Sequence, residues 1–326
     1  MLVDNHGRTI NYLRLAVTDR CNLRCFYCMP ESGIKYVNRK DLLSFEEMER
    51  LLRIFSASGV SKLRITGGEP FVRKGIMEFL EKASLIKGIE EINVTTNGTF
   101  TAEKVWQLES LGIRSVNLSL DSLDKNRFFD ITRRNEFDNV MKTFDRLLES
   151  SIKVKINMVV MEGRNIEDIL PMVELTRNNK VDVRFIEEMP FNGTEGQGNA
   201  TLWPSSKILT HISEKYELEK SIDPPISTSQ NYQPHGHKGN IGIIAAYTRT
   251  FCGSCNRIRL TPQGLLRTCL YSNVGVNFRD LLRSGASDEE IGNQLALTVG
   301  KRAKDGFKAE KLRDNTVSES MATIGG

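Results

Sequence analysis

The chain has 326 residues, of which 39% are hydrophobic and 26% are charged. These values are typical of a soluble globular protein, and no stretch approaches the ~18 apolar residues of a membrane span. The formal net charge of +4 comes without a dense block of Lys and Arg, so we expect neither nucleic acid nor a membrane as partner. The N-terminus lacks an export signal. We therefore expect a cytoplasmic protein with reduced cysteines.

Between residues 13 and 187, strand-like segments alternate with amphipathic helical stretches, as in repeated β-α units around a parallel sheet. The expected helices include 44–58 and 136–150. The expected strands lie at 13–17, 62–66, 91–96, 115–120, 153–160 and 181–187. This pattern predicts an α/β fold with helices on one face of the sheet.

The predicted strands alternate apolar and polar residues, although parallel strands are normally buried on both faces. One parity collects Arg14, Lys62, Arg64, Thr66, Asn93, Thr95, Asn117, Ser119, Lys155, Asn157, Asp182 and Arg184. Charges are not stable unpaired in a sealed interior, so we expect this face to line a water-accessible cavity for an anionic ligand. An antiparallel sheet with one solvated face is the alternative, which the intervening helices disfavour.

A triplet of cysteines, Cys21-x3-Cys25-x2-Cys28, follows the first predicted strand. Three thiolates can hold three irons of a cubane iron-sulfur cluster, which leaves the fourth iron open for chemistry. The alternatives are a zinc loop that lacks its fourth ligand and three thiols without a role. Paired CxxC spacing is more usual in zinc sites.

The segment Thr66-Gly67-Gly68-Glu69-Pro70 follows the second predicted strand at its carboxyl end, where ligands bind in parallel α/β folds. Two glycines permit close approach of the backbone to a ligand, although Gly-Gly before Pro is also a common turn. With the cysteine loop, this segment resembles the radical S-adenosylmethionine superfamily. The resemblance implies a 4Fe-4S cluster on Cys21, Cys25 and Cys28, whose open iron is chelated by S-adenosylmethionine.

Residues 190–238 are rich in Gly, Pro, Ser and Asn and are typical of connectors. Beyond them we expect strands at 241–248 and 256–260 and helices at 277–284 and 288–298. The expected domains are residues 1–220 and a smaller module, residues 221–326. That module carries a second triplet, Cys252-x2-Cys255-x13-Cys269. Zinc held by this triplet with His235 or His237 is the alternative to a cluster.

The segment FCGSCNRIRL around the second triplet narrows the resemblance to the GTP 3′,8-cyclase family over nearly the whole chain. The resemblance implies a partial (β/α)6 TIM-like barrel closed by an α+β module, with two 4Fe-4S clusters and S-adenosylmethionine as cofactors. It implies a lyase that converts GTP to (8S)-3′,8-cyclo-7,8-dihydroguanosine 5′-triphosphate in the first step of molybdenum cofactor biosynthesis. The further partners it implies are an electron donor, the next enzyme of the pathway and a second copy of the chain.

The resemblance also assigns individual residues. It places S-adenosylmethionine on Tyr27, Gly68, Ser119 and Met189. It places GTP on Arg14, Lys62, Arg64, Thr95, Lys155, Arg184, Arg257, Ile258 and Arg259. Among these, Arg14, Arg257 and Arg259 are the expected catalytic residues. Guanidinium forks suit triphosphate oxygens, whereas the alternative for any single cation is a solvated surface charge.

The chain ends in Gly325-Gly326. The resembled family also ends in two glycines, a tail thought to reach the active site, whereas the ordinary expectation for a terminus is fraying. Two other functions remain open at this point. One is a different two-cluster radical enzyme such as a peptide maturase, and the other is a non-catalytic, zinc-stabilised nucleotide-binding protein.

Overall fold

The computed structural model describes residues 1–30, 33–189, 202–313 and 320–325. Within them, one sheet of twelve strands runs in the order β12-β11-β10-β1-β2-β3-β4-β5-β6-β9-β8-β7. Its centre consists of parallel strands in chain order, β1 (Tyr12–Ala16), β2 (Lys62–Thr66), β3 (Glu91–Thr96), β4 (Ser115–Ser119), β5 (Lys153–Val160) and β6 (Asp182–Glu187). The six predicted strands are confirmed to within one residue at each end, and the antiparallel alternative is wrong for these strands.

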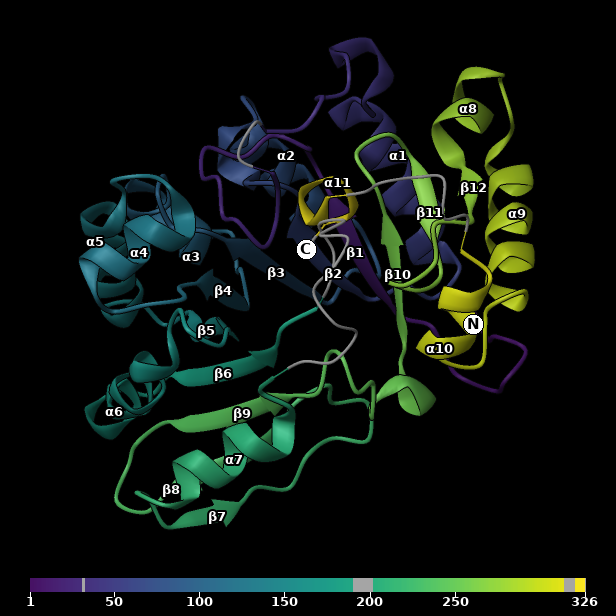
Figure 1. Cartoon of the computed structure of the whole chain (residues 1–326). Coiled ribbons are helices and arrows are strands. Elements are labelled where there is room, and N and C mark those ends of the chain that lie inside the picture. Colours follow the sequence, from purple (N-terminus) through teal and green to yellow (C-terminus); the bar gives the residue numbers. More distant parts are fainter. Residues whose placement is uncertain (31–32, 190–201, 314–319, 326) are drawn as a thin grey trace.

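Helices connect the parallel strands and lie on the outer side of the curved sheet (Figure 1). They are α1 (Phe45–Ala57), α2 (Ile76–Ser84), α3 (Val105–Ser110), α4 (Lys125–Thr132), α5 (Phe137–Leu148) and α6 (Ile169–Asn178). Single 3-10 turns occur at η1 (Arg39–Asp41), η2 (Pro70–Val72), η3 (Ala102–Lys104) and η4 (Ile166–Asp168). The predicted α/β fold is thus confirmed, and its curved, parallel-rich sheet agrees with the expected partial barrel.

The second half of the chain extends the sheet at both ends. Strands β9 (Asn240–Ile244) and β10 (Arg257–Leu260) pair in parallel with β6 and β1, respectively. The remaining elements are α7 (Ser205–Ser213), β7 (Leu218–Lys220), β8 (Gln230–Pro234), η5 (Cys252–Ser254), β11 (Leu265–Arg267), β12 (Val276–Asn277), α8 (Phe278–Arg283), α9 (Asp288–Gly300), α10 (Gly306–Lys311) and α11 (Met321–Ile324). The domain boundary predicted near residue 220 falls at the end of β7 and stays a prediction. Part of the predicted connector, residues 190–201, lies outside the described residues.

One predicted strand is shorter than expected, since β9 ends at Ile244 and not at residue 248. The reason is a buried carboxylate. The backbone N–H groups of Tyr247 and Thr248 donate to Glu187 at 2.9 and 2.8 Å, so these groups are not available to a neighbouring strand.

The strand register gathers the polar residues on the inner face of the sheet. Arg14 of β1 stands opposite Arg64 of β2 and Arg259 of β10. On β5, residues 154, 156, 158 and 160 are buried in the core, while the intervening residues 155, 157 and 159 are only partly buried. Because paired residues of neighbouring strands point to the same face, the sheet carries rows of cations on its inner side.

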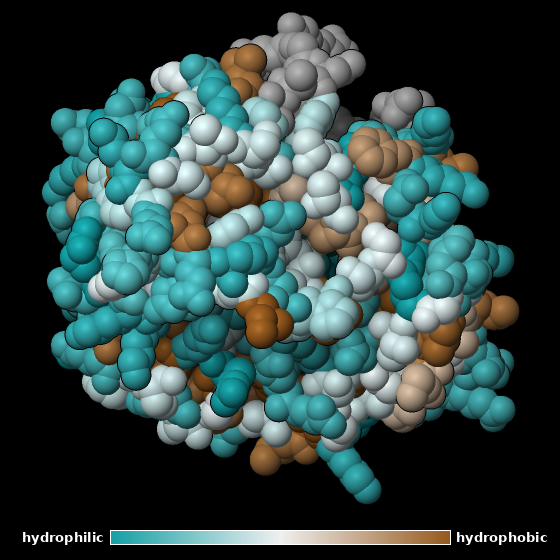
Figure 2. All heavy atoms as spheres, turned by 90° about the horizontal axis from the view of Figure 1, so that it is seen from below, coloured by the Kyte–Doolittle hydropathy of each residue, from teal (hydrophilic) through white to brown (hydrophobic). Residues whose placement is uncertain are grey.

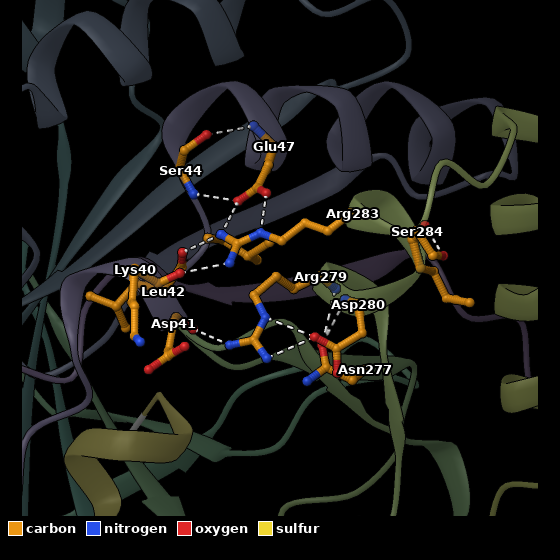
Figure 3. A network of polar contacts seen from close by, with 12 residues as sticks. Lys40, Asp41, Leu42, Ser44, Glu47, Asn277, Arg279, Asp280, Arg283 and Ser284 are labelled. Atoms are coloured by element: carbon orange, nitrogen blue, oxygen red, sulfur yellow. Dashed lines mark hydrogen bonds and ion pairs between the residues drawn. The ribbon is translucent and has the colours of Figure 1, made fainter.

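A polar network joins α8 to the start of α1 (Figure 3). Ser44 and Glu47 form the capping box of α1, and Arg283 of α8 donates to both carboxylate oxygens of Glu47 at 2.7 and 3.0 Å. Arg283 also donates to the carbonyls of Lys40 and Leu42. A bidentate guanidinium–carboxylate pair fixes orientation as well as distance, so this contact holds the C-terminal helices against the first β-α unit.

The lower face of the molecule is mainly hydrophilic, with hydrophobic residues scattered in small groups (Figure 2). Scattered apolar residues of this kind are normal on a protein surface. Among the described helices, none has the length and apolar character that a membrane crossing needs.

Candidate functional site

A cavity on the inner side of the sheet brings together most of the predicted site residues. Its lining includes both cysteine triplets and part of α11. The predicted residues in this lining are Arg14, Cys21, Cys25, Tyr27, Cys28, Arg64, Gly68, Thr95, Ser119, Arg184, Met189, Cys252, Cys255, Arg257, Arg259 and Cys269. Lys62, Lys155 and Ile258 are not part of it.

The first cysteine triplet lies on the loop after β1. The backbone N–H groups of Cys28 and Met29 both donate to the carbonyl of Cys25 at 3.0 Å, which makes the loop turn tightly. The N–H of Arg24 donates to the carbonyl of Thr132 at 2.9 Å and attaches the loop to the end of α4. All six cysteines of the chain are free thiols.

The environment of the first triplet disfavours thiolates that have no cation beside them. Burial raises the pKa of Cys21 to about 12 and that of Cys28 to about 11. Burial, followed by the carboxylate of Asp121, raises the pKa of Cys25 well above its ordinary value. An iron-sulfur cluster supplies both the positive charge and the soft acceptors that three buried thiolates need. The donor set therefore fits such a cluster.

Gly67 and Gly68 follow β2 and pack against this loop. A Cβ at Gly68 would lie 2.3 Å from the carbonyl oxygen of Arg20, and one at Gly67 would lie 2.5 Å from that of Thr18. The N–H of Gly68 donates to the carbonyl of Thr18 at 2.8 Å. The glycines are thus required by the cysteine loop itself, in addition to any ligand that approaches them.

The following residue, Glu69, is fully buried and accepts hydrogen bonds from the N–H groups of Phe71 and Asn97 and from the Thr96 hydroxyl. Burial raises the pKa of Glu69 to about 7. Glu69 therefore joins the ends of β2 and β3, and its charge acts on Cys21 of the first triplet.

The residues predicted to bind S-adenosylmethionine line the cavity next to this loop. The Tyr27 hydroxyl donates to Asp121 at 2.8 Å, and the second oxygen of Asp121 accepts from the N–H of Val159 at 2.9 Å. The Met189 sulfur accepts from the Tyr271 hydroxyl at 3.1 Å. Sequence reasoning missed Asp121, although its place directly after a predicted parallel strand is a usable signal.

The second triplet lines the same cavity. Cys252 lies in η5, Cys255 directly follows η5, and Cys269 follows β11. Arg302 donates to the Cys255 sulfur at 3.0 Å and to the Cys255 carbonyl at 2.8 Å. Burial opposes ionisation of Cys255, but the guanidinium groups of Arg302 and Arg257 outweigh it, so its pKa lies below the ordinary value. Burial raises the pKa values of Cys252 and Cys269.

The histidines of the zinc alternative lie elsewhere. His237 packs against Tyr216 and shares a 2.7 Å hydrogen bond with Thr176, and His235 lines a different pocket beside Glu217. Within the described residues, no three His, Cys, Asp or Glu side chains could hold a single metal ion. Neither histidine lines the cavity that holds the second triplet.

The basic residues of the inner face crowd together in the cavity. Burial lowers the pKa values of Arg184 and Arg259 to about 10. Burial, as the larger cause, and the like charge of Arg259 lower the pKa of Arg14 well below its ordinary value. An anion would relieve this repulsion. In addition, Asn117 Oδ1, Asn157 Oδ1 and Arg184 Nε are buried without a hydrogen-bond partner among the described residues.

Three residues predicted to bind the substrate do not line the cavity. Lys62 forms an ion pair with Glu91 at 2.7 Å, and Lys155 stands on β5 between Asn117 and Asp182 of the neighbouring strands. The Ile258 side chain is fully buried in the hydrophobic core. A role for these residues in substrate binding stays a prediction.

Besides Asp121, sequence reasoning missed Tyr12 and Thr228, which also line the cavity. The Tyr12 hydroxyl accepts from Arg64 Nε at 2.6 Å, and the ring of Tyr12 lies between Lys62 and Arg257, with distances of 5.2 and 5.5 Å to its centroid. Thr228 accepts from Arg257 at 3.4 Å. The parity of Tyr12 on the first strand matches that of Arg14, which is the signal that could have identified it.

The C-terminal tail enters the same cavity as far as Gly325. Ser320 caps the N-terminus of α11, and its hydroxyl donates to the carbonyl of Cys28 at 2.6 Å. The carbonyl of Gly325 accepts from Arg259 at 2.9 Å and from Arg14 at 3.3 Å. Gly326, the last residue of the predicted tail, lies outside the described residues.

The sequence matches two protein families. Residues 15–176 match the Radical SAM superfamily, and residues 181–308 match the Molybdenum Cofactor Synthesis C family. Among solved structures, Streptococcus suis SuiB bound to S-adenosylmethionine is similar, with a TM-score of 0.63 at 18% identity over 87% of this chain and 67% of that one. At this identity the similarity shows the fold alone.

Curated relatives cover the chain more closely. The mitochondrial GTP 3′,8-cyclase of Arabidopsis thaliana is 40% identical over 100% of this chain and 84% of that protein. The GTP 3′,8-cyclase of Clostridium perfringens is 38% identical over 99% of both chains. Molybdenum cofactor biosynthesis protein 1 of Dictyostelium discoideum is 41% identical over 89% of this chain, which spans only 47% of that longer protein.

Proposed function

The chain belongs to the GTP 3′,8-cyclase family, and we propose that it converts GTP to (8S)-3′,8-cyclo-7,8-dihydroguanosine 5′-triphosphate, the first step of molybdenum cofactor biosynthesis. One observation carries this proposal. Two triplets of free thiols line a single cavity together with basic residues from β1, β2, β6 and β10. This combination suits two iron-sulfur clusters and a polyanionic nucleotide.

In this proposal Cys21, Cys25 and Cys28 hold one 4Fe-4S cluster, and Cys252, Cys255 and Cys269 hold a second. When bound, S-adenosylmethionine and the first cluster supply the 5′-deoxyadenosyl radical that removes the 3′ hydrogen of the GTP ribose. Tyr27, Gly68, Ser119 and Met189 bind S-adenosylmethionine. The hydrogen bond from Tyr27 to Asp121 fixes the tyrosine ring and so orients the cofactor.

The basic face binds and orients GTP. Arg64 and Arg184, with Lys62 and Lys155 outside the lining, neutralise the triphosphate through charge-assisted hydrogen bonds. The Thr95 hydroxyl adds an uncharged hydrogen bond. Arg14, Arg257 and Arg259 are the proposed catalytic residues, and the docked carbonyl of Gly325 holds Arg14 and Arg259 in place.

The reaction needs an external electron donor, and the family implies two further partners, a second copy of the chain and the next enzyme of the pathway. These partners are part of the proposal.

Iron and sulfide quantitation on anaerobically reconstituted protein, followed by turnover with GTP and S-adenosylmethionine, tests the function. We expect two clusters per chain, brown protein, and formation of both 5′-deoxyadenosine and the cyclised nucleotide. The Cys252→Ser variant should lose roughly half of the iron, because each triplet holds one cluster. Protein with full iron content that forms neither product would contradict the proposed reaction, and a colourless zinc protein would contradict the clusters.

A further inference from the structure

The second cysteine triplet is held by a buried network from the two ends of the chain. The Arg8 guanidinium donates to the carbonyls of Cys252, Ala303 and Lys304 at 2.8 to 3.0 Å. It also pairs with the fully buried carboxylate of Asp4 at 2.6 Å. The N-terminal turn therefore fixes the loop of Cys252 against the segment that follows α9.

Arg302 lies at the centre of this network and is only 3% exposed. One nitrogen donates to the Cys255 carbonyl at 2.8 Å and lies 3.8 Å from Asp4. The other nitrogen donates to the Cys255 sulfur at 3.0 Å. The Arg302 carbonyl is itself within 3.2 Å of His6 Nε2. These contacts thus hold the positively charged guanidinium of Arg302 in an orientation that points one N–H at the Cys255 sulfur.

The two triplets differ in the charges around them. At the first triplet, Cys21 accepts from the neutral amide of Asn97 at 3.6 Å, and the carboxylates of Glu69 and Asp121 lie nearby. At the second triplet, cationic guanidinium groups surround the sulfurs, namely those of Arg249, Arg257, Arg259 and Arg302. Reduction of a cluster adds negative charge, which nearby cations and donors to sulfur stabilise and nearby carboxylates oppose.

We propose that Arg302 is a positioning residue for the second cluster, and that its hydrogen bond to the Cys255 sulfur raises the reduction potential of that cluster. Asp4 and Arg8 hold Arg302 and the loop in this geometry. The inference rests on the second cluster of the proposed function and adds a difference in redox character between the two sites. The first site is poised as the stronger reductant, and the second is easier to reduce.

The test isolates the second cluster in the full chain by replacing Cys21, Cys25 and Cys28 with Ser. In this parent, Arg302→Gln removes the charge and Arg302→Lys retains it. Arg53→Gln is the matched control, because Arg53 is an exposed arginine of α1 that pairs with Glu49 and does not line the cavity. The measurements are the midpoint potential, from a reductive titration followed by electron paramagnetic resonance, and the iron content of each variant.

We expect Arg302→Gln to shift the midpoint potential to a lower value, Arg302→Lys to recover part of the shift, and Arg53→Gln to match the parent. Equal potentials in all four proteins at equal iron content would overturn the role of Arg302 and leave the proposed function intact. If Arg302→Gln loses its iron, an unchanged potential in Arg302→Lys overturns the proposal and a partial fall supports it. A parent without iron would instead overturn the second cluster itself.

Discussion

Arg259 Nη1 donates a 2.9 Å hydrogen bond to the carbonyl oxygen of Gly325, which ties strand β10 to the end of the chain. Gly325 has a φ of +77°, and a Cβ there would lie 2.9 Å from the Cβ of Ala16 and 3.0 Å from Cγ2 of Thr66. The docked tail therefore requires glycine for its conformation and for the available space.

The Gly325→Ala variant should undock the tail. The left-handed conformation costs an L-residue about 1–2 kcal/mol, and the contact with β1 adds to this cost. We expect GTP turnover to fall at least tenfold, with the thermal midpoint of unfolding nearly unchanged. The matched control is Gly285→Ala, because Gly285 has a φ of +86° and nothing within 4 Å of its added Cβ. Equal losses of turnover in the two variants would contradict a role of the tail in the cavity.

The hydrogen bond between Arg64 and Tyr12 predicts a defect in GTP binding that spares S-adenosylmethionine. Tyr12→Phe removes the acceptor that holds Arg64 Nε at 2.6 Å, and hydrogen bonds to charged groups contribute ~1.5–3 kcal/mol. The KM for GTP should therefore rise about tenfold or more, whereas the KM for S-adenosylmethionine stays constant. Tyr232→Phe, at a more exposed tyrosine, is the control. A change confined to the KM for S-adenosylmethionine would refute this assignment.

Lys155 predicts a pH dependence of GTP binding. The pKa of Lys155 is lowered to about 7. Burial is the largest cause, the like charges of Arg184, Arg64 and Lys153 add to it, and the charge of Asp182 opposes it. Above this pKa the free side chain is largely neutral, so triphosphate binding must bring a proton with it. The affinity for GTP should be fully present below the pKa of about 7 and fall by up to about tenfold per pH unit above it.

Calorimetry in two buffers with different ionisation enthalpies measures this proton uptake directly. The Lys155→Met variant should bind GTP weakly at every pH and lose the slope. The Lys62→Met variant should keep the slope, because Lys62 is paired with Glu91 in the free protein. A wild-type affinity that does not change between pH 6.5 and 8.5, about half a unit below and 1.5 units above the pKa of about 7, would contradict the prediction.

Local patterns in the sequence were enough to predict the strands and the polar face, because alternation along a strand and strand order determine which side chains share a face. They could not predict contacts between distant segments. Arg8 reaches the carbonyl of Lys304, 296 residues away, and no local signal marks Arg302 as the partner of Cys255. Glycines 67 and 68 show the same limit, since their tight contacts include the backbone of residues 18–20, which only the folded chain brings together.

The hydrogen bonds of Glu187 predict that Glu187→Gln destabilises the fold and that Glu188→Gln, at the next residue, does not. Its buried carboxylate accepts from the N–H groups of Ser205, Tyr247 and Thr248 and from the Thr248 hydroxyl. In Glu187→Gln an amide NH2 replaces one of these oxygens and faces N–H donors, which leaves buried groups unsatisfied. We expect the free energy of unfolding in urea to fall by about 2–4 kcal/mol. Glu188→Gln is the control. Burial raises the pKa of Glu188 and thus already favours its neutral form, so this change should cost less than about 0.5 kcal/mol. If both variants lost the same free energy, the carboxylate of Glu187 could not be what anchors α7 and residues 247–248 to the end of β6.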